Sequence, residues 1–274
     1  MKYTIILLIS VSLILACGKK ENNGSTGDVK QTTTDSKNTN SGDLKFTDKS
    51  FLKSYNNCSP NDTCTYFKVD YIEAVSGKNK DKINNLISRI INVSTTLGET
   101  APPSMQVAAD TFMAQFVQMR KEFPESPQYW YLETSVAVDN ETPNILTIAA
   151  GNSSYLGGAH PNSYLQFYNI SKETGDTLTL SNLFAPGFEK KLNYLIDTKF
   201  RKDNNLKPGD DLADKGGLFE NKIAFNYNYT FTKEGGMTFY YNQYEIASYA
   251  QGPIEVTLSK DDIAPLLSQN SPLK

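Results

Sequence analysis

The chain is organised around Tyr155-Leu156-Gly157-Gly158-Ala159-His160-Pro161-Asn162, which is followed directly by the strand-like segment Ser163–Ile170. Adjacent glycines allow the backbone to adopt positive φ or to approach another segment closely. The proline fixes its own φ and restricts the residue before it. His160 is the only histidine of the protein. The stretch therefore predicts one narrowly defined loop between two apolar strands, and this loop carries the lone imidazole.

The segments on both sides of this loop are typical of short strands separated by turns. Strands are predicted at Thr65–Ala74, Gln128–Asp139, Ile145–Gly151, Ser163–Ile170, Thr177–Leu180, Phe225–Phe231, Met237–Tyr241 and Ile254–Leu258. Gly235-Gly236 joins two of them as a hairpin. This regular alternation of strands and tight turns favours an antiparallel arrangement.

Three helices are predicted by apolar stripes and end signals. The clearest stripe runs from Ile83 to Ile91, a second helix follows Ser104 and ends at Pro124, and a third begins after Pro186-Gly187. The element order predicts an α+β fold, with antiparallel sheets and helices packed on one side. A soft boundary separates an N-terminal subdomain, residues 44–126, from a C-terminal subdomain, residues 127–274, that carries the GGAHPN motif.

The N-terminus is typical of an export signal. Residues 1–16 are predicted to be a lipoprotein signal peptide: Met1-Lys2 gives a positive start, and Tyr3–Ala16 is an apolar run too short for a stable membrane span. Ile14-Leu15-Ala16-Cys17 resembles a lipobox. An ordinary secretory signal with a coincidental cysteine is the alternative. On the lipoprotein interpretation Cys17 carries lipid, and residues 17–43 form a flexible polar linker. We expect an exported protein that is anchored by lipid to the periplasmic or cell-surface face of a membrane.

Charge and cysteine content narrow the class of protein further. The formal charge is −3, and loss of the signal with Lys2 leaves −4, so the sequence does not indicate nucleic-acid binding. Cys58 and Cys64 bracket a turn, and in an oxidising compartment such a pair predicts a disulfide. A metal site at these cysteines would require more His or Cys ligands, and only His160 remains. No cofactor is predicted.

A single histidine restricts the possible chemistry. Histidine-based zinc and deacetylase centres require at least two histidines. A Ser-His-Asp site needs only one, but the chain has no Gly-x-Ser-x-Gly motif. His160 is expected to hold the loop in shape, and contact with a ligand is the alternative. Glycoside hydrolysis uses a pair of carboxylates. The sequence contains several candidate acids, but their spacing does not identify one pair. These are Glu133, Asp139, Glu141, Glu173, Asp176, Glu245 and Glu255.

Tyrosines recur after the predicted hairpin, in Phe239–Pro253. Alternating tyrosines at the end of a strand can form a recognition surface, because tyrosine joins a large rigid ring to a polar tip. They can equally be half-buried sheet residues. The possible binding or structural positions are Gly157, Gly158, His160, Asn162, Tyr244, Glu245 and Tyr249.

Two blocks of sequence resemble a known family. They are Tyr155–Asn162 with Phe167–Phe184, and Phe231–Tyr241 with Tyr244–Gly252. Together they are similar to a paired domain of unknown function, which occurs in anti-sigma-V factors of the RsiV type and in peptidoglycan deacetylases of the PdaC type. The resemblance covers residues from about Cys64 to Leu267. It implies an α+β fold outside the cytoplasm and, from the RsiV branch, a receptor that binds lysozyme.

We therefore expect a non-enzymatic binding module of the cell envelope whose partner is peptidoglycan or a wall-active enzyme such as lysozyme. A small cell-wall glycan hydrolase and a purely structural envelope lipoprotein are the alternatives. Glycan turnover that is lost in a single Glu, Asp or His160 variant would distinguish the hydrolase from the binding module.

Overall fold

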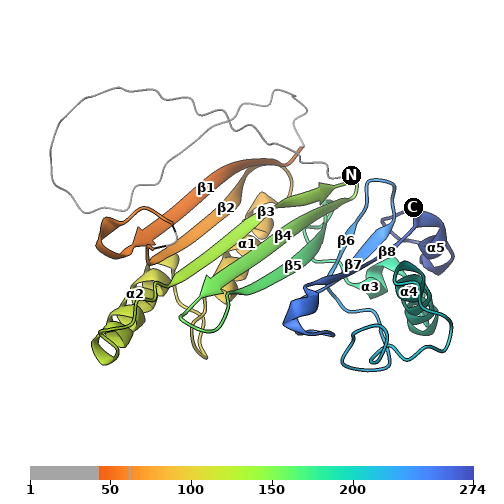
Figure 1. Ribbon diagram of the computed structural model, residues 1–274. Helices are drawn as coiled ribbons and strands as arrows, with labels where there is room; N and C mark the ends of the chain where they lie inside the picture. Colours follow the sequence, from red (N-terminus) through yellow and green to blue (C-terminus); the bar gives the residue numbers. More distant parts are fainter. Residues whose placement is uncertain (1–42, 62) are drawn as a thin grey trace, which may run out of the picture.

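A computed structural model describes residues 43–61 and 63–274 of the protein. It contains two β-sheets and the helices that pack against them (Figure 1). The first sheet has the strand order β1-β2-β3-β4-β5: β1 (Lys45–Ser54), β2 (Tyr66–Ser76), β3 (Tyr131–Glu141), β4 (Ile145–Tyr155) and β5 (Asn162–Ser171). The second contains β6 (Tyr229–Phe231), β7 (Met237–Tyr241) and β8 (Ile254–Leu258). The predicted α+β class is confirmed. The predicted signal, the predicted lipidation site Cys17 and all but the last residue of the predicted linker lie outside the described residues.

Every pair of neighbouring strands is antiparallel except β2 and β3. That parallel pair is joined through α1 (Lys80–Ser94) and α2 (Met105–Glu122), which supply the long crossover that parallel strands require. Figure 1 shows α1 passing behind the sheet. Its stripe, Ile83 to Ile91, is buried as predicted, and Ser104 caps α2 by accepting a hydrogen bond from the backbone N–H of Val107.

Strand β1 was not among the predicted strands. It lies at one edge of the sheet and pairs only with β2, and its charged residues weaken the apolar alternation that identifies a strand. The predicted disulfide is confirmed just beyond it, because Cys58 and Cys64 are bonded across a Cα–Cα distance of 5.7 Å.

The second sheet packs with α3 (Leu180–Leu183), α4 (Glu189–Asp203) and α5 (Lys260–Ile263). Two strand predictions need correction in this half. Thr177 makes only an isolated bridge to Ile170, and Leu180 begins α3 because Thr179 and Asn182 form a capping box. The predicted strand Phe225–Phe231 is shortened to β6.

Two hydrophobic cores divide the molecule at a place other than the predicted one. The first core lies between the five-stranded sheet and α1 and α2, and the second surrounds β6, β7, β8 and α4. The boundary predicted between residues 126 and 127 lies inside the first unit, because β3 pairs with β2 in one continuous sheet.

Asparagine side chains, rather than a sixth strand, cover part of the outer edge of β5. Asn242 accepts a hydrogen bond from Leu165 N at 2.7 Å, and its amide donates to Leu165 O at 3.0 Å. Asn228 accepts from Phe167 N at 2.9 Å and donates to Leu165 O at 2.7 Å. Both side chains are buried. We call this pair the asparagine clasp. Because a primary amide has the donor and acceptor of a peptide group, the clasp satisfies edge groups and joins the two halves.

Candidate functional site

The loop between β4 and β5 is held against the first core by its first glycine. Gly157 has a φ of +84°, and a Cβ built on it would lie 2.3 Å from Gln128 Oε1 and 3.1 Å from Trp130 Nε1. Trp130 in turn packs against Phe112 and Phe116 of α2. Gly158 has open space around it instead, since the nearest atom is 4.0 Å away. The two glycines therefore have different roles, which the sequence did not distinguish.

We expect Gly157→Ala to cost about 1–2 kcal/mol of stability through its left-handed backbone alone, with the contact to Gln128 adding to this cost. Gly158→Ala, the matched control, should stay within about 0.5 kcal/mol of the wild type. Chemical denaturation of both variants measures the difference. Equal losses in the two variants would contradict the role assigned to Gly157.

His160 contacts two tyrosines from the other half of the chain. Its ring stacks on Tyr249, with ring centroids 3.8 Å apart and planes 22° from parallel. Its Nε2 lies 3.3 Å from the hydroxyl of Tyr244, and its Nδ1 lies 2.9 Å from Pro161 O. A carbonyl oxygen can only accept, so Nδ1 carries the proton and, in the neutral ring, Nε2 accepts from Tyr244. We call His160, Tyr244 and Tyr249 the His160 cluster.

The turn after β7 positions the tyrosine side of this cluster. Glu245 accepts hydrogen bonds from Asn242 N at 2.9 Å and from the side chain of Asn226 at 2.8 Å. Tyr244 adopts a left-handed φ of 65°, and its side chain projects at the surface with 55% of its area exposed. Because Asn242 also belongs to the clasp, the same residue anchors β5 and the turn that carries Tyr244.

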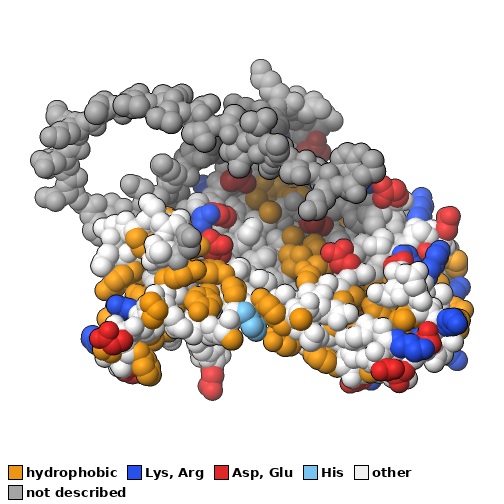
Figure 2. All heavy atoms as spheres, in the orientation of Figure 1, with side chains coloured by type: hydrophobic (Ala, Val, Ile, Leu, Met, Phe, Trp, Pro, Cys, Tyr) orange, Lys and Arg blue, Asp and Glu red, His pale blue; other side chains and the backbone are white. Residues whose placement is uncertain are grey.

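Of the positions singled out in the sequence, the structure brings His160, Tyr244 and Tyr249 into contact. The other positions have different structural roles. Gly157 packs on the first core, Glu245 holds the turn, and Asn162 is exposed at the start of β5. Figure 2 shows the histidine at the surface between two areas of apolar and aromatic side chains.

Several of the candidate acids make contacts between elements. Glu141 pairs with Lys172 and Asp176 with Lys82. Asp139 accepts from Thr230, and Glu133 accepts from Tyr66 at 2.8 Å. The hydrogen bond from Lys82 holds the pKa of Asp176 below its usual range. In the part of the chain that the structure describes, no group of three His, Cys, Asp or Glu side chains could hold a metal ion.

A row of tyrosines on the first sheet was missed by the sequence reasoning. Tyr66, Tyr131 and Tyr155 are direct partners on β2, β3 and β4, and Tyr129 packs against the last two. We call these four residues the tyrosine ladder. The signal, a tyrosine near one end of each strand, is present in the sequence, but only the strand register shows that these residues adjoin.

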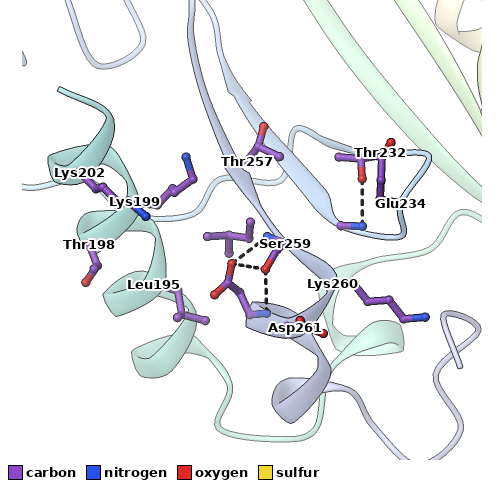
Figure 3. A pocket seen from close by; sticks show the side chains of 13 residues that line it. Leu195, Thr198, Lys199, Lys202, Thr232, Glu234, Thr257, Ser259, Lys260 and Asp261 are labelled. Carbon is purple, nitrogen blue, oxygen red and sulfur yellow. Dashed lines mark hydrogen bonds between the residues drawn. The ribbon is translucent and has the colours of Figure 1, made fainter.

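A hollow with a volume of about 940 Å³ lies between α4, the β6–β7 turn and α5 (Figure 3). Lys199 and Lys202 come from α4, and Glu234 and Asp261 come from the opposite walls. Asp262 is used to cap α5 through Ser259. Basic and acidic groups balance in this hollow, so its charge selects no class of ligand.

Comparison with known proteins shows the class to which this fold belongs. Residues 58–163 match the family model described as deacetylase PdaC, and residues 181–261 match a protein family of unknown function, DUF3298. The chain therefore carries a PdaC-type region followed by a DUF3298 region. These two matches confirm the resemblance to the paired domain that the sequence motifs indicated.

Solved structures support the same fold. A DUF3298 family member from Bacteroides fragilis has a TM-score of 0.67 and 22% identity, over 85% of this chain and 96% of that one. A DUF3298 family protein from Pseudomonas aeruginosa has a TM-score of 0.63 and 16% identity, over 84% and 97% of the two chains. At these identities the likeness concerns the fold alone. No curated protein matches the chain. Among the described residues, no helix is long and apolar enough to cross a membrane.

Proposed function

We propose that the protein is an exported, lipid-anchored binding module of the cell envelope that captures a wall-active enzyme such as lysozyme, or peptidoglycan itself, through the His160 cluster. The observation that carries this proposal is the meeting of three aromatic rings from two halves of the chain at an exposed surface. The family resemblance and the lipobox around Cys17 support the envelope location.

The geometry of the cluster favours a protein partner over a sugar. His160 covers one face of Tyr249 at 3.8 Å, so that face cannot stack on a pyranose ring. The cluster instead presents ring edges, the Tyr244 hydroxyl and, on the same loop, Leu156 with 44% of its area exposed. Tyrosines of this kind are enriched at the centres of protein interfaces. The charge of −4 on the mature chain would favour encounter with a basic partner.

Binding of the purified protein to lysozyme and to soluble muropeptides, measured by calorimetry, tests the proposal. We expect the double variant Tyr244→Ala/Tyr249→Ala to bind its partner about 30-fold more weakly, which corresponds to a loss of about 2 kcal/mol at a central interface residue. His160→Ala should weaken binding in the same direction. The matched control is Tyr194→Ala on α4, because Tyr194 is 68% exposed and lies outside the cluster.

Three results would count against the proposal. Absence of binding to both lysozyme and muropeptides would remove the function. Unchanged binding by the double variant would remove the site. Hydrolysis of muropeptides that stops in a single Glu or Asp variant would favour the hydrolase alternative.

A further inference from the structure

The face of the five-stranded sheet opposite the helices carries an ordered array of side chains. Phe67 and Leu132, which are partners in register, belong to the core under α1 and α2, so the residues next to them along each strand point to the other face. Three successive rows lie there across β2, β3 and β4: Tyr66-Tyr131-Tyr155, Lys68-Glu133-Ser153 and Asp70-Ser135-Gly151. An aromatic row therefore borders two polar rows, which combine charged side chains with serine and glycine.

We propose that this face is a binding site for an oligosaccharide, in which the tyrosine ladder packs against the apolar face of a sugar ring and the polar rows bind its hydroxyl groups. The inference goes beyond the proposed function, because it assigns a second site, away from the His160 cluster, to a glycan ligand.

The ladder offers ring surface that its own packing leaves uncovered. Tyr66 and Tyr131 are nearly parallel, at 15°, with centroids 5.8 Å apart, and Tyr131 lies 6.4 Å from Tyr155. Centroid distances of this size are those of offset rings, which overlap only in part. Tyr129, Tyr131 and Tyr155 are each partly exposed. The exposed parts of these rings form an aromatic strip that can pack against the C–H groups on one face of a pyranose.

Hydrogen bonds within the sheet hold the polar groups beside the ladder in place. The hydroxyl of Tyr66 donates to Glu133 Oε1 at 2.8 Å. Burial and this bond to Glu133 raise the pKa of Tyr66, so the hydroxyl stays protonated and acts as the donor. Asp70 is held by Lys68 at 2.6 Å and by Ser50 at 2.7 Å. Carboxylates fixed in this way can accept hydrogen bonds from sugar hydroxyls without reorganising.

Two adjoining hollows give the ligand room. One, of about 260 Å³, is lined by Lys68, Glu133, Gly151 and Ser153 together with Asp70 and Ser135. The other, of about 310 Å³, shares Asp70 and Ser135 and extends to Ser50 on β1. Each is close to the lower end of the range typical of small-ligand sites, about 300–1,000 Å³. Because they are contiguous, the face can receive more than one sugar unit.

The chemistry of the rows also disfavours other ligands. Strands β2, β3 and β4 are each paired on both sides, so an extended peptide could not add to them through backbone hydrogen bonds. Two carboxylates, Glu133 and Asp70, stand beside one lysine, and a polyanion would meet net repulsion. Uncharged, hydroxyl-rich rings fit both the aromatic strip and the mixed polar rows.

Calorimetric titration of the purified protein with a hexamer of N-acetylglucosamine and with a glucose hexamer tests the inference. We expect Tyr131→Ala and Glu133→Gln each to weaken binding of the bound hexamer at least tenfold. Tyr131→Phe, which keeps the ring, should stay within about threefold of wild type, because the hydroxyl makes only a 3.4 Å contact to Ser153. Thermal melts of all variants identify any that fail to fold.

The two proposed sites can be tested separately, because each has variants that should leave binding at the other unchanged. The double variant Tyr244→Ala/Tyr249→Ala should keep wild-type affinity for the hexamer, and Glu133→Gln should keep its affinity for lysozyme. The inference is overturned if neither hexamer binds, if folded Tyr131→Ala and Glu133→Gln bind as wild type does, or if only the His160 cluster variants lose hexamer binding.

Discussion

Replacing both residues of the asparagine clasp, Asn228→Ala/Asn242→Ala, should lower the free energy of unfolding by about 4 kcal/mol, because each buried backbone group left without a partner costs about 1–3 kcal/mol. The groups concerned are the N–H of Leu165, the N–H of Phe167 and the carbonyl of Leu165, which lose every clasp bond described above. Such a loss is a large fraction of the stability of a typical domain, about 5–15 kcal/mol.

Urea denaturation of the wild type, the two single variants and the double variant measures this effect. The singles should each lose about 2 kcal/mol, and the control Asn85→Ala, on the exposed side of α1, should change stability by less than about 0.5 kcal/mol. Partner binding at the His160 cluster should weaken as well, because Asn242 positions the turn that carries Tyr244. A loss of under 1 kcal/mol in the double variant would mean that water replaces the clasp without penalty.

Gly236→Ala should destabilise the second sheet by about 3 kcal/mol, at the upper end of the usual cost of overpacking. A Cβ at this position would lie 2.4 Å from the carbonyl oxygen of Leu258 and 3.2 Å from Thr232 Oγ1. Neither side can move freely, since Gly236 accepts a hydrogen bond from Thr232 N at 3.0 Å and donates one to Thr232 Oγ1 at 3.1 Å. The strain must therefore be relieved by displacing β8.

The neighbouring glycine provides the matched control for this prediction. Gly235 has a φ of +83°, but its nearest contact is the flexible Lys260 side chain at 3.4 Å, so Gly235→Ala should cost about 1 kcal/mol. Thermal and chemical denaturation of the two variants give the ranking. If Gly235→Ala proves the more damaging change, backbone conformation rather than the contact with β8 dominates this hairpin.

Elements with strong local signals were predictable from the sequence. The stripe from Ile83 to Ile91 and the capping residue Ser104 identify helices, because the 3.6-residue period and the cap act within a few residues. The Cys58–Cys64 disulfide follows from a short spacing. Strand β1 and the true length of β6 were not predictable in this way, because pairing with distant strands defines them.

In the candidate site, too, the individual residues were predictable from the sequence, whereas their contacts were not. His160, Tyr244 and Tyr249 were selected as residues, but His160 and Tyr244 are 84 positions apart and meet only because the clasp binds the turn to β5. The tyrosine ladder could not be assembled from composition. A shift of one residue between β2 and β3 would have placed Tyr66 and Tyr131 on opposite faces.

By itself, then, the amino-acid sequence determined the fold class, most of the helices and strands, the disulfide and the family, because these depend on periodicity, capping, short spacings and contiguous motifs. The tertiary structure alone decided where the two cores divide, that β2 and β3 run parallel, and which rings share a surface. These features depend on strand register and on hydrogen bonds between residues far apart in the chain, such as those from Asn228 and Asn242 to β5, which no local pattern specifies.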